Sequence, residues 1–166
     1  TSLQMPATDL AFNKNINVDG NIPEIIGITT SADGYYKSSN IIDFNIIFDQ
    51  QVIINTTEGE PQLELNTIPP SYAFYNSGNS SNTLTFRYTI GASEDSPDLD
   101  YTSVNAFTLE GGSITDDITN DADLTLPAVG TISGSKDIII DNTKPSVTVT
   151  ISETDHLITD TDVGTA

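Results

Sequence analysis

Apolar residues occupy every second position in two stretches of this chain. The first stretch carries Ile42, Phe44, Ile46 and Phe48, and the second runs from Leu84 to Ile90 in the same rhythm. Successive side chains of a β-strand point to opposite faces, so a period of two predicts a strand with one face in a core. No apolar spacing of three and four residues is sustained over three helical turns. We therefore expect two central strands and no substantial helix.

Six shorter stretches fit the same rule. Clusters rich in Gly, Asn and Ser separate them, as at positions 31–34 and 76–81, and such residues favour turns. Seven or more short strands with frequent turns indicate an all-β chain folded as an antiparallel β-sandwich. The expected shorter strands are Glu24–Thr30, Val52–Asn55, Gln62–Leu65, Tyr72–Tyr75, Phe107–Leu109 and Asp137–Ile140.

A sequence pattern near the start returns near the end. The segment Lys14–Asp19 matches Lys136–Asp141, and the following Pro23 matches Pro145, both at a spacing of 122 residues. Repeats of this length suit whole domains in tandem rather than the short units of a solenoid. Chance likeness of two β-rich stretches is the alternative, and the constant spacing argues against it.

The repeat divides the chain into three parts. Residues 1–21 are expected to be the terminal strand of a preceding unit with its linker, and residues 22–141 one complete unit. Residues 142–166 are expected to hold a linker and the first strand of the next unit. Both junctions are short and end at a proline, which restricts its own backbone and the residue before it, so we expect them to be semi-rigid.

The charge of the chain excludes several partners. Twenty-four acidic residues face five basic ones, which gives a formal net charge of −19. Nucleic acid and anionic membrane surfaces repel such a chain. No apolar run approaches the length of a membrane span, so no membrane insertion is expected. Divalent cations are the simplest way to offset the self-repulsion of the folded state.

Two acidic segments supply oxygens of the kind that Ca²⁺ binds. One is the loop at positions 116–123, and the other is an extended segment in which two aspartates are two residues apart and share a face. The alternative is that these are solvated turn residues, because Asp and Asn favour turns. The candidate ligands of this site are Asp98, Asp100, Asp117, Asn120, Asp121 and Asp123.

The two junctions offer a second set of calcium ligands. A cation held between adjacent units would lock them together. No EF-hand or glycine-rich nonapeptide pattern supports either set, and solvated turn acids are again the alternative. The candidates are Asp19, Asn21 and Glu24 at the first junction and Asp141 and Asn142 at the second.

The composition offers few of the side chains that enzymes use for catalysis. The chain has no cysteine, and its one histidine, His156, aligns with the turn residue Gly34 in the repeat. Nucleophilic triads and zinc sites need more than this. We therefore expect that the protein is not an enzyme.

Several segments together resemble a known family. Residues 33–36, 42–48, 82–89, 98–101, 111–127 and 141–149 resemble the tandem immunoglobulin-like repeats of giant bacterial adhesins, in the extender regions of RTX-type adhesins and their ice-binding relatives. The resemblance implies an immunoglobulin-like Greek-key sandwich. It implies an extracellular, calcium-stiffened spacer at a bacterial cell surface, which projects a distal binding region and contacts neighbouring repeats. Cell adhesion and biofilm formation are the processes that such arrays serve.

Two other functions remain open. The chain could be a filament subunit, in which an orphan strand at 1–21 or 143–151 completes the sandwich of a neighbouring molecule. It could also be a glycan-binding module, which would need an exposed aromatic platform. The aromatic candidates are Tyr35, Tyr36, Tyr72, Phe74 and Tyr75, and the sequence favours packed or half-exposed roles for them.

Overall fold

The computed structural model of this protein describes residues 20–150. These residues form an all-β fold, and no helix is present among them, so none of them belongs to a helix that could cross a membrane. The strands are β1 (Ile25–Thr30), β2 (Gly34–Tyr36), β3 (Ile41–Asn55), β4 (Gln62–Leu65), β5 (Ser71–Ser77), β6 (Ser81–Thr89), β7 (Phe107–Thr108), β8 (Ser113–Thr115) and β9 (Ile138–Ile140).

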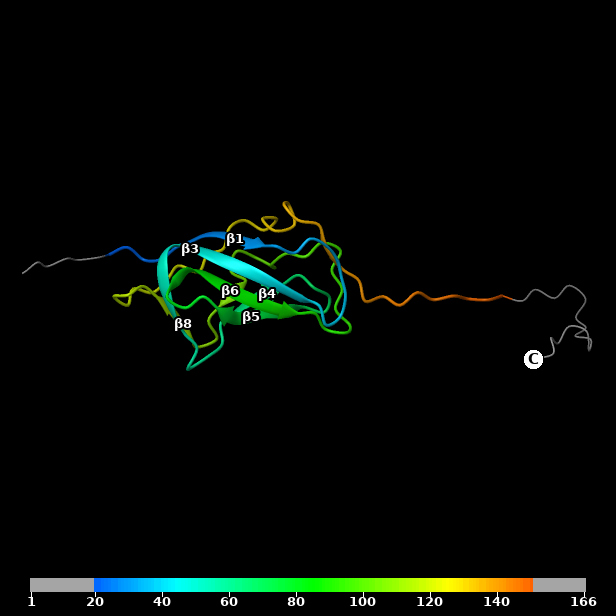
Figure 1. Cartoon of the computed structure of the whole chain (residues 1–166), viewed down its shortest axis with the longest axis horizontal. Coiled ribbons are helices and arrows are strands. Elements are labelled where there is room, and N and C mark those ends of the chain that lie inside the picture. Colours follow the sequence, from blue (N-terminus) through cyan, green and yellow to red (C-terminus); the bar gives the residue numbers. More distant parts are fainter. Residues whose placement is uncertain (1–19, 151–166) are drawn as a thin grey trace, which may run out of the picture.

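Most strands belong to one antiparallel sheet that curls into a half-barrel (Figure 1). Its path runs β1-β3-β6-β5-β4-β7, and β8 pairs with the far part of β3. The expectation of antiparallel strands is confirmed, and β4 has the predicted bounds. The strands predicted at Glu24–Thr30 and Tyr72–Tyr75 lie at β1 and β5, whose observed bounds differ by one or two residues.

One strand of this sheet is much longer than the others. β3 has 15 residues, and its pairing with β6 shifts register between Ile47 and Val52. Such a shift bends a strand without ending it. Before the shift β3 pairs with β1 and β6, and residues 53–55 pair with β8. The prediction of a separate strand at Val52–Asn55 is therefore wrong, because the chain bends there and does not turn back.

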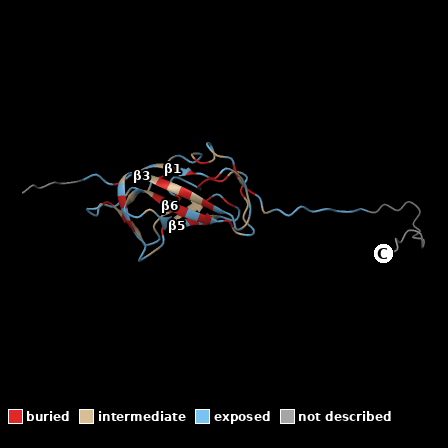
Figure 2. Cartoon of the chain, in the orientation of Figure 1, coloured by how far each residue is buried: buried red, intermediate tan, exposed pale blue. Residues whose placement is uncertain are grey.

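The core fills the concave side of the curled sheet. Alternate residues of β3 and β6 are buried, as the predicted period of two requires, and Figure 2 shows this alternation along both strands. Phe86 lies at the centre of an aromatic group. Its ring meets Phe107 edge-on at 5.0 Å between centroids and Tyr75 at 5.9 Å. Aromatic pairs of this kind add about 1 kcal/mol each beyond the apolar area they bury.

A second, parallel sheet of two strands completes the fold. β2 pairs with β9, and Ile138 and Ile140 of β9 are buried. The sequence assigned residues 31–34 to a turn, and β2 begins at the last of them, Gly34, which has a positive φ of 86°. β8 was also unforeseen. Both strands have three residues, too few for an alternation to stand out.

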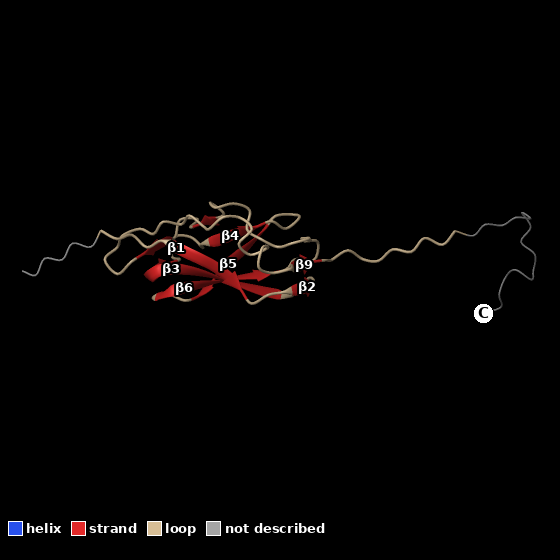
Figure 3. Ribbon diagram, turned by 90° about the horizontal axis from the view of Figure 1, so that it is seen from above, coloured by secondary structure: helices blue, strands red, loops and turns tan. Residues whose placement is uncertain are grey.

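The described chain joins this body at opposite ends (Figure 1). We call the end reached by residues 20–24 the N-terminal end, and the end left by residues 141–150 the C-terminal end. The 116–123 loop lies at the N-terminal end, whereas β2 and β9 lie beside the outgoing segment at the C-terminal end (Figure 3). This arrangement separates the two predicted junctions by the length of the fold.

Candidate functional site

The N-terminal end brings together the first junction and the acidic loop. The backbone N–H of Asp123 donates to the carbonyl of Pro23 at 2.8 Å, and Glu24 and Asp123 form a parallel β-bridge. The side-chain amide of Asn120 donates to the carbonyl of Asn21 at 3.4 Å. Four predicted ligands, from two separate sequence regions, are therefore neighbours at this end.

The loop at this end is shaped by Asp116. One carboxylate oxygen accepts hydrogen bonds from the backbone N–H groups of Ile118 and Asn120 at 3.0 and 2.8 Å. The other accepts one from the Asn120 side chain at 2.8 Å. Desolvation raises the pKa of Asp116, but the hydrogen bonds, led by those from Asn120, outweigh it and hold that pKa below its ordinary value. This aspartate fixes the turn that displays its neighbours.

Three further acids lie on the outside of the same end. Asp117, Asp121 and Asp123 are exposed to solvent. Asp123 accepts a hydrogen bond from the backbone N–H of Thr125 at 2.9 Å, and hydrogen bonds from Thr125 lower its pKa. Asp49 adds a further carboxylate, which accepts from the backbone N–H of Glu24 at 3.0 Å. The surface here is strongly anionic.

Asp100 serves a different part of the chain from this loop. It is 2% exposed. One of its oxygens accepts from the backbone N–H of Tyr101 at 2.8 Å. The other accepts from the N–H of Gly130 and from both the N–H and the hydroxyl of Ser133, at 2.9, 3.2 and 2.9 Å. Its oxygens are therefore engaged in holding the 130–133 turn.

Asp98 lies on the same segment as Asp100, and one of its carboxylate oxygens accepts no hydrogen bond from the described residues. Its Oδ1 is buried and has no hydrogen-bond partner among the described residues. Nearby, the side chain of Asn66 donates to the carbonyl of Asp98 at 2.9 Å and accepts from the N–H of Asp100 at 2.9 Å. The two aspartates are thus organised by Asn66 and not by the 116–123 loop, although the sequence analysis placed them in one site with that loop.

The C-terminal end is organised by Asn142. Its side-chain carbonyl accepts from the N–H of Ser38 at 2.6 Å, and its side-chain amide donates to the carbonyls of Glu94 and Gly91 at 2.6 and 3.2 Å. Its backbone N–H donates to the carboxylate of Asp95 at 2.6 Å. Asn142 therefore ties the start of the outgoing segment to two loops that are distant in sequence.

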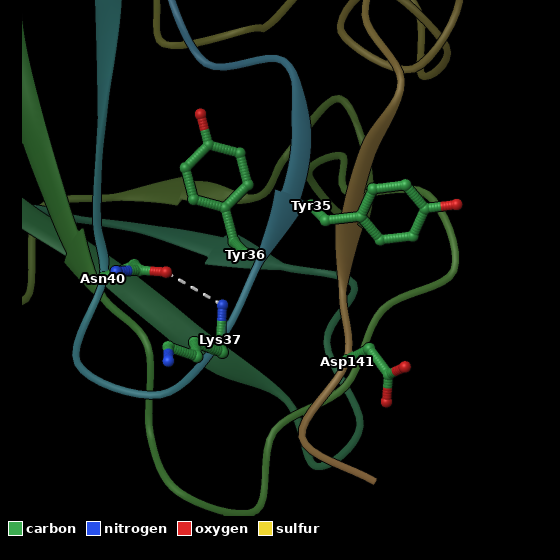
Figure 4. Close-up of a pocket in the computed structure, with 5 residues that line it drawn as sticks. All are labelled: Tyr35, Tyr36, Lys37, Asn40 and Asp141. Carbon is green, nitrogen blue, oxygen red and sulfur yellow. Dashed lines mark hydrogen bonds between the residues drawn. The ribbon is translucent and has the colours of Figure 1, made fainter.

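A shallow pocket opens beside this residue at the C-terminal end (Figure 4). Figure 4 shows Tyr35 and Asp141 on one side of it, and Tyr36, Lys37 and Asn40 on the other. Tyr35 is 80% exposed, whereas Tyr36 packs against the core. Asp141 is exposed, and its carboxylate accepts from the N–H of Thr143 at 2.9 Å. A second pocket, at the N-terminal end, is lined by Gly20, Asn21, Ile22, Glu24, Asp49 and Gln50.

The predicted ligands carry oxygen atoms of the type that binds a cation, but the structure does not gather the described ones at one place. Within residues 20–150, no group of three or more Asp, Glu, His or Cys side chains is arranged to hold a metal ion. The candidates form three sets: Asn21, Glu24 and the loop residues; Asp98 and Asp100; and Asp141 with Asn142. Asp98 Oδ1 and the exposed loop carboxylates retain capacity for a ligand. Asp19 and His156 lie outside the described residues.

Several residues that organise these sites were not singled out in the sequence. Asn66 and Ser38 each make a bond across more than 30 residues, to Asp98 and Asn142 respectively. Asp116 was noted only as part of the acidic loop at 116–123, and Asp95 was not selected. The sequence signal for Asp116 is an Asp followed three and four residues later by the polar residues Thr119 and Asn120, because an Asp side chain at the start of a turn accepts hydrogen bonds from the backbone that follows it. No local pattern points to Asn66 or Ser38, because their partners are remote.

Comparisons with protein-family models, with curated proteins and with solved structures gave no match to this chain. The physical arrangement of the two ends is therefore the basis for a functional proposal.

Proposed function

We propose that this protein is a structural spacer unit of a long extracellular array at a bacterial cell surface. The observation that carries the proposal is that the chain joins the folded body at opposite ends (Figure 1). The 122-residue repeat then places like units in a row, each beginning where the last one ends. Such a row gains length with every unit, which suits the projection of a distal binding region.

Within this proposal the unit is an immunoglobulin-like sandwich with Greek-key connections. Support comes from its antiparallel strands, its core of alternate side chains from β3 and β6, and the parallel pairing of β2 with β9. Residues 1–21 and 142–166 are parts of its neighbours in the array. A spacer connects its neighbours through the polypeptide chain and catalyses no reaction. In this proposal the protein is therefore not an enzyme.

Calcium has a surface role in the proposal. The exposed acids Asp117, Asp121 and Asp123 belong to the loop that contacts the first junction through Asn120 and the backbone of Asp123, so an ion bound to that loop would reduce repulsion at the joint. Extracellular modules bind Ca²⁺ with dissociation constants of about 10⁻⁴–10⁻³ M. The ion would neutralise these negative charges and would be coordinated by oxygen atoms of both the loop and the junction. The fold itself is stabilised by its own hydrogen bonds.

The filament subunit is the second candidate. The described segment 142–150 is extended and has no strand partner, and Val147 and Val149 are 88% and 78% exposed. Strand β1 ends the path of the large sheet, with Ile26 64% exposed. An exposed apolar segment and a sheet edge are the two components of strand addition between molecules.

Two experiments test the spacer. In the first, a two-unit chain is made from residues 1–144 followed directly by residues 23–166, which keeps the natural spacing. Small-angle X-ray scattering should show a rod close to twice the length of the single unit. A compact pair of units would contradict the proposal. Dissociation of large single-unit assemblies in denaturant would favour the filament.

In the second experiment, thermal unfolding of residues 1–166 is compared in calcium, magnesium and EDTA. Binding to the folded state alone stabilises it by about 1.4 kcal/mol at a tenfold excess over the dissociation constant. We expect a higher melting temperature in calcium only, and a smaller rise for Asp117→Asn/Asp121→Asn. The control is Asp137→Asn, an exposed acid beside β9. Equal curves in calcium and EDTA would remove the ion from the proposal but leave the spacer.

A further inference from the structure

We propose that β9 and Asn142 form a clamp that bears tension applied along the chain. The inference rests on the proposed function, because an array that projects a binding region is pulled from its two ends. It adds a mechanical role that the spacer alone does not require.

The first observation is that β9 is held on both of its edges. On one edge it pairs in parallel with β2, and the flanking bonds are Gly34 N–H to the Asp137 carbonyl at 2.7 Å and Asp141 N–H to the Tyr36 carbonyl at 3.0 Å. On the other edge Ile140 and Ser96 exchange two bonds of 2.8 and 2.9 Å. A three-residue strand thus has the pairing of a central strand.

Side-chain bonds close the β2–β9 pair at both of its ends. Before β9, the N–H of Asp137 donates to the carboxylate of Asp33 at 3.1 Å. After β9, the side chain of Asn142 accepts from the N–H of Ser38 at 2.6 Å. Both bonds join residues 104 positions apart in the sequence. The pair is therefore crosslinked beyond the length of its own ladder.

The direction of the strands decides how a load falls on these bonds. β2 lies near the start of the unit and β9 at its end, and the two run parallel. Tension on the outgoing segment pulls β9 along its own axis, past β2 and past Ser96. The hydrogen bonds join β9 to its neighbours across that axis, at a slant in the parallel pair, so tension along β9 loads them together in shear.

Tension on the outgoing segment reaches Asn142 before it reaches Asp141 and β9. It makes four hydrogen bonds, to Ser38, Gly91, Glu94 and Asp95. These bonds transfer the load to two loops before it reaches β9. Buried Ile138 and Ile140 resist the same displacement, because sliding β9 would drag both side chains through the core.

The test is single-molecule force spectroscopy of the 166-residue chain, pulled from its two ends. Removing the Asn142 side chain deletes three of the four bonds, and Asn142→Ala should raise the unfolding rate at fixed force about tenfold. The matched control is Asn76→Ala in β5, whose side chain makes a single 3.4 Å bond to its neighbour Ser77. It should leave the unfolding rate unchanged.

A second pulling direction separates a clamp from a merely stabilising residue. The chain has no cysteine, so handles can be attached through Asn76→Cys and Glu110→Cys, two exposed positions away from β9. In this direction Asn142→Ala should change the rate much less than in end-to-end pulling. Equal increases in both directions, or no increase end to end, would overturn the clamp. The scattering of the two-unit chain does not depend on this result, so the spacer can stand if the clamp fails.

Discussion

The curled sheet and the segment that covers it are stabilised in different ways. In the sheet, β3 pairs with β1 and β6 over most of its length, and apolar side chains fill the concave face. The covering segment, residues 91–137, contains only two short strands, β7 and β8, which join the sheet by pairing with β4 and with the far part of β3. There the backbone groups bond to scattered backbone partners in loops and turns and, in addition, to side chains, notably the carboxylates of Asp100 and Asp116.

This difference gives the acidic residues of the covering segment a structural task. A buried backbone N–H that lacks a strand partner must find another acceptor. Carboxylates supply strong ones, because hydrogen bonds to charged groups are roughly twice as strong as neutral ones. An acidic composition can thus serve the fold directly.

The largest effect should come from the sheet. Phe86 is fully buried and contacts Phe107 and Tyr75, so Phe86→Ala leaves a cavity and should lower the free energy of unfolding by about 4 kcal/mol. Urea unfolding measures it. Exposed Phe74 on β5 is the control, and Phe74→Ala should cost much less. Equal losses at the two positions would contradict the assignment of the core.

The second effect should come from the covering segment. Asp100→Ala removes the acceptor of four hydrogen bonds and should lower the free energy of unfolding by about 3 kcal/mol. Asp100→Asn keeps the shape and one acceptor oxygen, so it should lose less. If both variants unfold at the same urea concentration as the parent chain, carboxylates do not stabilise this segment.

Acid should weaken the covering segment before the sheet. The pKa values of Asp116 and Asp123 are lowered in the folded state, so the stability they contribute is present above the ordinary aspartate pKa of 3.8 and is lost as pH falls below it. Amide hydrogen exchange at falling pH, corrected for intrinsic rates, should show opening of residues 114–125 first. Asp116→Asn should flatten this pH dependence. Simultaneous opening of β3 would contradict the order.

The smallest effect should come from the convex face of the sheet. Arg87 donates two hydrogen bonds of 2.8 Å to Asp43, and this pair is exposed. The partner guanidinium lowers the pKa of Asp43 through their hydrogen bond. Exposed pairs contribute about 0.5 kcal/mol, so Arg87→Ala should change the urea midpoint only slightly. A loss as large as that of Asp100→Ala would show that polar surface contacts matter in the sheet too.

The sequence predicted the sheet better than its cover. The apolar alternation at 42–48 and 84–90 continues over enough residues to indicate a strand with one buried face. These stretches correspond to the central strands β3 and β6. β2 and β8 escaped prediction because three residues hold too little alternation, and because Gly34 reads as a turn residue. The bend in β3 was read as a break for a similar reason, since Asp49 and Gln50 interrupt the apolar pattern.

For the candidate sites, the sequence identified polar residues that matter but not their neighbours. Asn142 and Asp100 were chosen as calcium ligands, and the structure shows them bonded to protein groups. Local sequence cannot reveal this, because Ser38 and Gly130 are remote from them. The grouping of Asn21 with Asn120 was equally invisible, although each was selected separately. Calcium binding stays a prediction.

The pairing of β2 with β9 also sets when the unit can be completed during synthesis. Gly34 and Ile138 meet only after about a hundred intervening residues have been made, and pairings this distant in sequence are slow to form. β1, β3 and β6 all precede residue 90, so they can associate before β9 has been made. A nascent unit would therefore expose the place of β9 until its last strand emerges.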